Sequence, residues 1–338
     1  MDLDRDLAVA VVRAHFPPAP PTRRGWETNA ATGVRGLRLL GEAERFGAFR
    51  LSEANDRSFS VLARNSSERP GATAVQEDAR RPTFAEGTRF DYVDVDPYGS
   101  PLPFLDAAFA SLEPGGLLAV TATDMMVLAG AQPSATRRLY GAEPVRGRLG
   151  PEAGLRILLG RLARTARRNG QSVRPLLGYV GEHHVRAFVV VGPATHRADP
   201  VETIDRAAFD GPSLGTGAPV GPLWVGPLGD PALLSRIDVP ATAAAPRELS
   251  RLLELLRGEA AVHRPFFYEA NTLASALGLE RPAALSRLRE ALSELGFPSA
   301  RTHVRPEGLK TDAPRSVVER LARELAGDAQ SQNARVRA

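Results

Sequence analysis

Residues 90–101 read Phe-Asp-Tyr-Val-Asp-Val-Asp-Pro-Tyr-Gly-Ser-Pro. The short, mostly apolar run at 90–95 predicts a strand, and Asp96, Pro97 and Tyr98 follow at its carboxyl end. The Asp96 carboxylate and the Pro97 carbonyl can accept hydrogen bonds from an NH2 group, and the Tyr98 ring offers a stacking face. We therefore expect this corner of the backbone to hold a flat base by its exocyclic amine.

Strand-like and helix-like segments alternate through the first half of the chain. The strands are expected at 25–29, 48–53, 73–77, 90–96, 117–121, 173–178 and 187–191, and the helices at 34–44, 57–65, 102–112 and 153–169. This alternation predicts an α/β fold with a doubly wound, mostly parallel sheet. Such sheets bind ligands at the carboxyl ends of their strands, where Asp96 would lie.

The remaining sequence predicts a linker and a smaller second domain. The segment 192–222 is rich in Gly, Pro and Thr and has no clear periodicity. Leucines at 249, 252, 253 and 256 follow helical spacing, those at 285, 288 and 292 repeat it, and 300–304 is β-like. Two helices and a strand favour an α+β winged-helix-type domain, a common nucleic-acid scaffold. We expect a first domain at 1–195, a linker region at 196–220, a C-terminal domain at 221–326 and a disordered tail at 327–338.

The composition excludes several classes of site. The chain of 338 residues has no cysteine, which rules out disulfides and cysteine-ligated zinc. No apolar run approaches the ~20 residues of a membrane helix, and the acidic start at 1–6 is unlike a signal peptide. The six histidines show no defensible ligand spacing with acids. We expect a cytoplasmic protein with no metal and no membrane contact.

The positive charge is almost entirely arginine, because Lys310 is the only lysine. Ten arginines fall within 137–174, against two acids, Glu143 and Glu152. Arginine forks suit phosphate oxygens, so this segment favours a polyanionic partner, although the codon bias of a GC-rich genome also explains the composition. Arginines 161, 164 and 168 share one helical face, which is either a phosphate-tracking stripe or a merely solvated face.

Residues 26–36, Trp-Glu-Thr-Asn-Ala-Ala-Thr-Gly-Val-Arg-Gly, lie between the first strand and the first helix after it. Small residues there let the backbone approach a nucleotide-type cofactor, although a plain turn is the alternative. The loop lacks both G-x-G-x-x-G and Gly-Lys-Ser/Thr, which disfavours a dinucleotide fingerprint and an ATP phosphate loop. Glu53 ends the second strand, where an acid typically holds a ribose diol. Asp78 and Ala79 follow the third strand, as Asp96 follows the fourth.

These motifs together resemble the tRNA (guanine-26-N2)-dimethyltransferase family of class I S-adenosylmethionine-dependent methyltransferases. The matching strings lie at 4–9, 31–38, 96–101, 121–124, 154–160, 221–224, 300–303 and 308–312, and they are distributed through most of the chain. The resemblance implies a Rossmann-like catalytic domain, tRNA as the partner, a monomer, and transfer of one or two methyl groups to N2 of guanine 26.

The resemblance also implies roles for individual residues. The S-adenosylmethionine-binding residues would be Arg5, Gly33, Arg35, Glu53, Asp78 and Ala79. Asp96 would be the catalytic residue that holds the guanine amine. Pro97 and Tyr98 would complete the base pocket.

The chain also departs from the family pattern. Relatives carry a segment before the Arg-Asp-Leu motif, whereas four residues precede Arg5 here, and Asp4 replaces the usual Asn. Glu53 stands where relatives usually have Asp, and the zinc-binding cysteine cluster of many relatives is missing. Two alternatives therefore remain: a catalytically impaired tRNA-binding homologue, and an amino-methyltransferase acting on another RNA position or amine.

Overall fold

The computed structural model describes residues 2–18, 20–194 and 199–337, with side chains described up to 327. The helices of the first part are α1 (Asp2–His15), α2 (Val34–Glu42), α3 (Asp56–Ser66), α4 (Leu105–Ser111), α5 (Met125–Leu128), α6 (Pro133–Tyr140) and α7 (Gly150–Arg168). Its strands are β1 (Arg23–Glu27), β2 (Phe46–Glu53), β3 (Ala72–Gln76), β4 (Phe90–Val95), β5 (Leu112–Ala122), β6 (Gln171–Val180) and β7 (Val185–Pro193).

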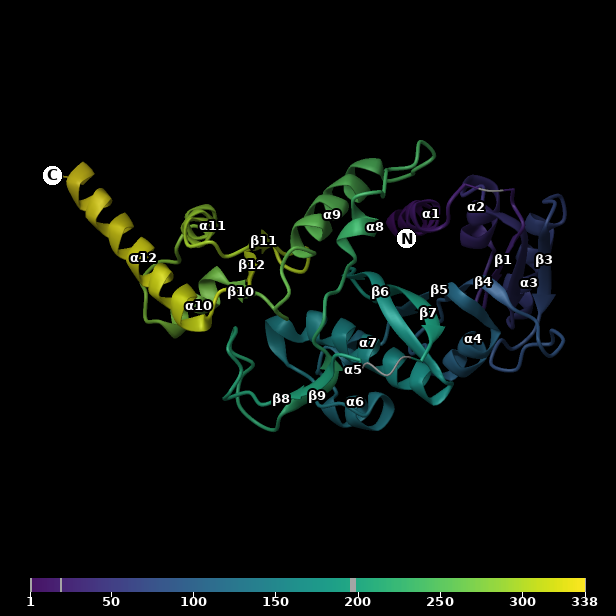
Figure 1. Ribbon diagram of the computed structural model, residues 1–338, viewed down its shortest axis with the longest axis horizontal. Coiled ribbons are helices and arrows are strands. Elements are labelled where there is room, and N and C mark those ends of the chain that lie inside the picture. The colour runs from purple at the N-terminus through teal and green to yellow at the C-terminus, as the bar shows by residue number, and fades with distance from the viewer. Residues whose placement is uncertain (1, 19, 195–198, 338) are drawn as a thin grey trace.

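A seven-stranded sheet with the order β3-β2-β1-β4-β5-β7-β6 forms the centre of this first part. The strands β1 to β5 run parallel, and β7 runs antiparallel to both β5 and β6. The sheet and its helices are seen at the right of Figure 1. The predicted doubly wound, mostly parallel α/β fold is confirmed. Each expected strand is present, and β5 begins five residues earlier than its apolar run suggested.

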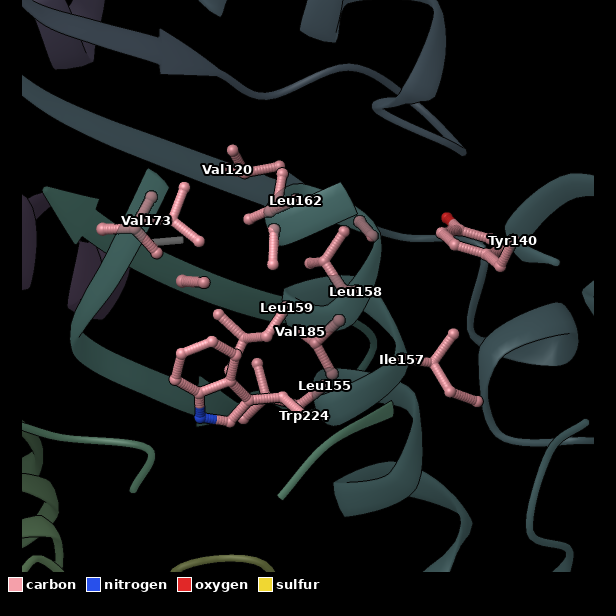
Figure 2. Close-up of a cluster of buried hydrophobic side chains, with 14 of the residues drawn as sticks. Val120, Tyr140, Leu155, Ile157, Leu158, Leu159, Leu162, Val173, Val185 and Trp224 are labelled. Atoms are coloured by element: carbon pink, nitrogen blue, oxygen red, sulfur yellow. The ribbon is translucent and has the colours of Figure 1, made fainter. Parts of the chain in front are cut away.

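The longest helix of the first part, α7, covers one face of the sheet with an apolar surface. Leu155, Leu158, Leu159 and Leu162 are fully buried in one hydrophobic cluster, which Figure 2 shows together with Trp224. Trp224 belongs to β9 (Val220–Trp224), which pairs antiparallel with β8 (Val201–Ile204). This hairpin thus packs against α7 as part of the core.

The hairpin changes the interpretation of the expected linker at 196–220. Residues 196–198, next to the expected boundary at 195, lie outside the described residues. The part from 199 onward contains β8, and Ile204 and Leu214 join the core of the first domain. The Gly- and Pro-rich composition concealed this strand, because only four residues of β8 carry the pairing.

The expected start of the C-terminal domain at 221 also falls inside a shared core. The helices α8 (Pro231–Leu234) and α9 (Pro246–Glu259) lie beside α1 in Figure 1. Leu233, Leu249 and Leu253 bury their side chains in the same cluster as Leu7 and Val11 of α1. The chain up to about residue 260 therefore packs with the seven-stranded sheet, and an independent unit begins later than the sequence suggested.

A third, smaller core belongs to the C-terminal part. The elements of this C-terminal part are β10 (Tyr268–Glu269), α10 (Ala270–Ala276), α11 (Leu285–Glu294), β11 (Ser299–Arg301), β12 (Gly308–Thr311) and α12 (Arg315–Arg337). The three strands form an antiparallel sheet with the order β10-β12-β11. The tail expected to be disordered after Gly327 instead continues α12, which ends at Arg337.

A buried charge cluster joins this C-terminal part to the first. Lys310 of β12 lies 3.2 Å from a carboxylate oxygen of Glu152 in α7 and 2.9 Å from one of Glu259 in α9. His303 accepts a hydrogen bond from the Val180 backbone N–H at its Nε2 atom, so its Nδ1 carries the proton that is shared with Glu259, 2.6 Å away. The only lysine of the chain thus connects three separate elements.

The described residues contain no helix both long and apolar enough to cross a membrane. They also contain no group of three or more His, Cys, Asp or Glu residues placed to hold a metal ion.

Candidate active site

The acids predicted to follow three strands do reach one edge of the sheet. β3, β2, β1 and β4 are consecutive parallel neighbours, so their carboxyl ends meet at that edge. Glu53, the last residue of β2, pairs with Gln76 of β3, and Glu27, the last residue of β1, pairs with Asp94 of β4. Asp78 and Asp96 therefore follow at the same edge of the sheet.

Glu53 fixes the loop that precedes α2. One of its carboxylate oxygens accepts the Ala31 N–H at 2.8 Å, and the other accepts the Asn55 N–H at 2.7 Å. Ala31 has φ 48° and Gly33 has φ 81°, both in the left-handed region. A Cβ atom at Gly33 would lie 2.5 Å from the Leu62 side chain, so glycine is required there on both counts.

Arg35, at the start of α2, is surrounded by carboxylates. It forms a short ion pair with Asp96, and its guanidinium lies 3.5 Å from Asp94 and 3.8 Å from Glu27. Only 9% of the side chain is exposed. Burial lowers the pKa of Arg35, but these carboxylates outweigh burial and raise it. Its expected contact with the methyl donor stays a prediction, because the described ion pairs of its guanidinium are all with acids of this chain.

Asp94 and Arg186 form a second, fully buried pair that the sequence did not suggest. The Arg186 guanidinium lies 2.6 Å and 3.1 Å from the two Asp94 oxygens and 2.5 Å from the Thr121 hydroxyl. Tyr92 donates its hydroxyl proton to Asp94 at 2.6 Å. Burial raises the pKa of Asp94, but Arg186 and Arg35 outweigh it, so the pKa is lowered and Asp94 stays ionised.

Glu27 behaves in the opposite way. Its side chain is buried, and burial raises its pKa to about 8, with Asp94 and Asp96 adding to the increase and Arg35 opposing it. One Glu27 oxygen accepts the Gly36 N–H at 3.0 Å. At neutral pH the protonated form of Glu27 therefore predominates, and Arg35 faces two carboxylate anions.

The predicted catalytic corner presents its groups outward. The Asp96 side chain is 25% exposed, Pro97 is buried, and the Tyr98 side chain is fully exposed. Two backbone contacts hold the turn, since Gly99 N–H donates to the Thr123 hydroxyl at 2.6 Å and Thr123 N–H donates to the Gly99 carbonyl at 3.0 Å. The Asp96 side chain thus lies at the surface of this edge of the sheet, as expected.

A hydroxyl cluster supports the same turn from α6. The Tyr140 hydroxyl lies 2.9 Å from both oxygens of Asp124 and 3.0 Å from the Ser100 hydroxyl. Burial raises the pKa of Asp124, although the hydrogen bond from Tyr140 opposes the increase. The sequence gives the 121–124 string no role and does not point to Tyr140, because the contact of Tyr140 depends on how α6 folds back.

The remaining donor-site candidates lie in two places. Arg5 is on α1, where its guanidinium lies 3.2 Å from Asp2. Asp78, after β3, is paired with Arg80 at 2.5 Å near the surface, and Ala79 is buried in the main core. Hydrogen bonds also tether α1 to the β6–β7 hairpin, because Asp4 contacts the Tyr179 hydroxyl and lies 2.9 Å from His184.

The arginine-rich segment 137–174 is less cationic in space than in sequence. Acids from other parts of the chain pair with four of its arginines: Arg148 with Glu269, Arg167 with Asp199, Arg168 with Asp106, and Arg174 with Asp230.

The expected arginine stripe on α7 is not a free face. Arg164 donates to the backbone carbonyls of Tyr140 and Pro222, so its guanidinium supports the fold. Burial, followed by repulsion from Arg168, lowers the pKa of Arg161.

Comparison with known proteins places this site in a family. The family described as N2,N2-dimethylguanosine tRNA methyltransferase matches residues 1–207 and 214–323. A tRNA (guanine(26)-N(2))-dimethyltransferase of Thermococcus kodakarensis is 34% identical over 94% of this chain and 90% of its own. The Pyrococcus furiosus enzyme of the same name is 33% identical over 85% of this chain and 83% of its own.

A solved structure agrees with the sequence relatives. Trm1 from Pyrococcus horikoshii, in complex with S-adenosyl-L-methionine, superimposes with a TM-score of 0.82 at 28% identity. The match covers 95% of this chain and 92% of that one. The predicted resemblance is thus confirmed over most of the chain, and the chain belongs to the N2,N2-dimethylguanosine tRNA methyltransferase family.

Proposed function

We propose that this protein transfers methyl groups from S-adenosylmethionine to the exocyclic N2 atom of guanine 26 in tRNA. The observation that carries the proposal is the partly exposed carboxylate of Asp96, which follows β4 at the edge of the sheet. Arg35 holds its Oδ2 atom, while its Oδ1 atom accepts no hydrogen bond from the described residues. One oxygen is thereby fixed and the other is available to an amine.

The residues around this edge fit the methyl donor. S-adenosylmethionine carries ribose hydroxyls and an adenine amine that need acceptors, and it supplies an electrophilic methyl group when bound. Glu53 is positioned by two backbone N–H groups and keeps further lone pairs for a diol. Asp78, Ala79, Gly33, Arg5 and Arg35 complete the proposed donor site.

Guanine N2 is a weak nucleophile because its lone pair is delocalised into the ring, so alignment has to supply much of the catalysis. Asp96 and the Pro97 carbonyl accept the two amine hydrogens and turn the lone pair away from the ring. Orientation of this kind contributes at most roughly 7–11 kcal/mol. The Asp96 carboxylate also stabilises the positive charge that develops on nitrogen. Tyr98 provides the stacking surface for the base, which has to leave its helical stack at a cost of a few kcal/mol.

For the C-terminal part we propose RNA binding. From α9 onward the elements follow in the order helix, strand, helix, helix, strand, strand, helix, and the three strands form one small antiparallel sheet. This order supports the expected winged-helix-type domain, with its independent core beginning near residue 268. A monomeric state and a cytoplasmic location remain predictions.

The decisive experiment uses the purified protein, methyl-labelled S-adenosylmethionine and two transcripts of one tRNA, with guanine or adenine at position 26. We expect label only in the guanine transcript and recovery of N2-methylated guanosine by mass spectrometry of the digested RNA. Donor binding by calorimetry without any transfer would identify a catalytically impaired homologue. Label in another nucleoside, or equal label in both transcripts, would contradict the proposed position.

A further inference from the structure

A cavity of about 620 Å3 lies outside the proposed active site. Residues 212–218, residues 143–149 and the helices α10 and α12 surround it. None of the proposed donor or base residues lines it. Its volume falls within the range of small-ligand sites. Leu149, Leu214 and Leu273 give part of its wall an apolar character.

One wall of the cavity carries a cation that is held by carbonyls alone. Arg206 donates to the backbone oxygens of Leu214, Ala218 and Pro144. No carboxylate pairs with it among the described residues. Since carbonyl dipoles orient a guanidinium without cancelling its charge, Arg206 leaves a fixed positive charge in the wall.

A second arginine strengthens this positive character. Arg146 also lines the cavity, is exposed, and makes no ion pair within the described part of the chain. Two other arginines in the wall are neutralised, because Arg148 pairs with Glu269, and Arg315 lies 2.6 Å from Glu319. The charge offered to a ligand therefore comes from Arg206 and Arg146.

The wall of the cavity includes a tyrosine whose hydroxyl has no hydrogen-bond partner among the described residues. Tyr268 lines the cavity and is 6% exposed, and its buried hydroxyl oxygen makes no hydrogen bond with the described residues. Burial, followed by repulsion from Asp210, raises the pKa of Tyr268, so the group stays a proton donor. A buried donor without a partner costs ~1–3 kcal/mol, which a ligand acceptor would recover.

We propose that this cavity binds a second, unstacked nucleotide of the RNA substrate, away from the methylated guanine. The apolar wall accepts a base, Arg146 and Arg206 attract its phosphate, and Tyr268 donates to a base or phosphate oxygen. Unstacked nucleotides are the part of an RNA that proteins read most readily. The inference rests on the proposed tRNA substrate, and a free nucleoside monophosphate has the same chemistry.

Two single substitutions test the site in the full-length protein. Tyr268→Phe removes only the hydroxyl, and Arg146→Gln removes an exposed charge. Each should raise the Kd for tRNA by roughly 3–10-fold, the size of one lost hydrogen bond or phosphate contact. Arg146→Gln should also reduce the slope of log K against log salt by about 1. The matched control is Arg57→Gln, an exposed arginine on α3, which should leave both quantities unchanged.

Methyl transfer separates this inference from the proposed function. We expect both variants to keep the wild-type kcat and to raise the KM for tRNA. Transfer by the wild type together with unchanged Kd and KM in both variants would overturn the nucleotide site and leave the function standing. If the wild type transfers no methyl group but both variants bind tRNA more weakly than it does, the nucleotide site stands and the proposed function is wrong.

Calorimetry with AMP distinguishes the source of the nucleotide. Weak or absent AMP binding, together with the loss of tRNA affinity, supports an RNA nucleotide. The opposite result would be AMP binding that both variants abolish, with an unchanged affinity for tRNA. This result would assign the cavity to a free nucleotide and would overturn the proposal that it binds a nucleotide of the RNA.

Discussion

Arg186 of β7 reaches across β5 to Asp94 of β4, and neither side chain has any solvent exposure. The two nitrogen–oxygen distances are 2.6 Å and 3.1 Å. The pair therefore couples the antiparallel hairpin at one side of the sheet to the strand that presents Asp96. Arg35 links this buried pair to the proposed catalytic residue, because its guanidinium contacts both Asp94 and Asp96.

Replacing Arg186 by methionine should cost about 3–5 kcal/mol of unfolding free energy, because it leaves the buried Asp94 charge without its main partner. Urea denaturation at neutral pH measures the change. Arg64→Met, at an exposed position on α3, serves as the control and should change stability by less than about 0.5 kcal/mol. A loss below about 1 kcal/mol for Arg186→Met would show that the pair contributes little.

Replacing Asp96 by asparagine should reduce kcat at least about 100-fold, because it removes the negative charge that stabilises the developing positive charge. The Kd for S-adenosylmethionine should stay within a few-fold, since the asparagine oxygen can still accept the Arg35 hydrogen bond and the other proposed donor residues do not contact Asp96. Single-turnover transfer and calorimetry measure the two quantities. Asp106→Asn, at an exposed acid of α4, is the matched control. Near-normal turnover of Asp96→Asn would show that the base pocket is misassigned.

Replacing Tyr140 by phenylalanine removes the hydroxyl that joins Asp124 and Ser100 behind the proposed catalytic turn. We expect kcat to fall roughly 3–10-fold, the equivalent of one hydrogen bond, with the donor Kd unchanged. Ser67→Ala, which removes an exposed hydroxyl far from the turn, should not alter kcat. Equal losses in both variants would argue against a role for Tyr140 in positioning.

Replacing Glu27 by glutamine should make stability less dependent on pH. Folding raises the pKa of Glu27 from 4.5 to about 8. The contribution of protonated Glu27 to the free energy of unfolding is therefore fully present below pH 4.5 and is lost as the pH rises through 8. Glutamine keeps an acceptor for the Gly36 N–H but cannot ionise. At pH 8 the variant should be more stable than the wild type by about 4 kcal/mol, since one pKa unit corresponds to about 1.4 kcal/mol, and the difference should shrink to about 2 kcal/mol at pH 6. Parallel thermal melts that show no such trend would contradict the assignment.

Replacing Lys310 by methionine leaves Glu152 and Glu259 with less compensation for burial, and we expect a loss of about 3–5 kcal/mol. In the wild type, burial raises the pKa of each glutamate, but Lys310 with Arg156 or His303 outweighs it and lowers the pKa. This stability is therefore present above pH 4.5 and is lost as the pH falls through the lower folded-state values. Differential scanning calorimetry between pH 3 and 7 should show the wild-type advantage begin to shrink as the pH falls below 4.5. If the difference in stability between the wild type and the variant is the same at pH 3 and pH 7, the proposed contribution of the Lys310 ion pairs is wrong.

Much of the sheet and of the proposed site could be predicted because both depend on local patterns. The strand at 90–95 and the acids after each strand follow from short periodicities and from the geometry of parallel sheets. Gly33 could be selected in the same way, since a strand-to-helix turn favours a residue that accepts positive φ.

The contacts that sequence missed join distant segments. Arg186 interrupts an apolar strand, and a charge inside such a run is a signal that a buried partner exists, but nothing local identifies Asp94 as that partner. The arginine-rich segment misled for the same reason, because Asp199, Asp230 and Glu269 approach it only in space.

The buried ion pairs of Lys310 with Glu152 and Glu259 have a mechanical consequence. Since Lys310 ties β12 to α7 and α9 by charges that are costly to separate in the interior, any movement of the C-terminal part relative to the seven-stranded sheet would have to break these ion pairs.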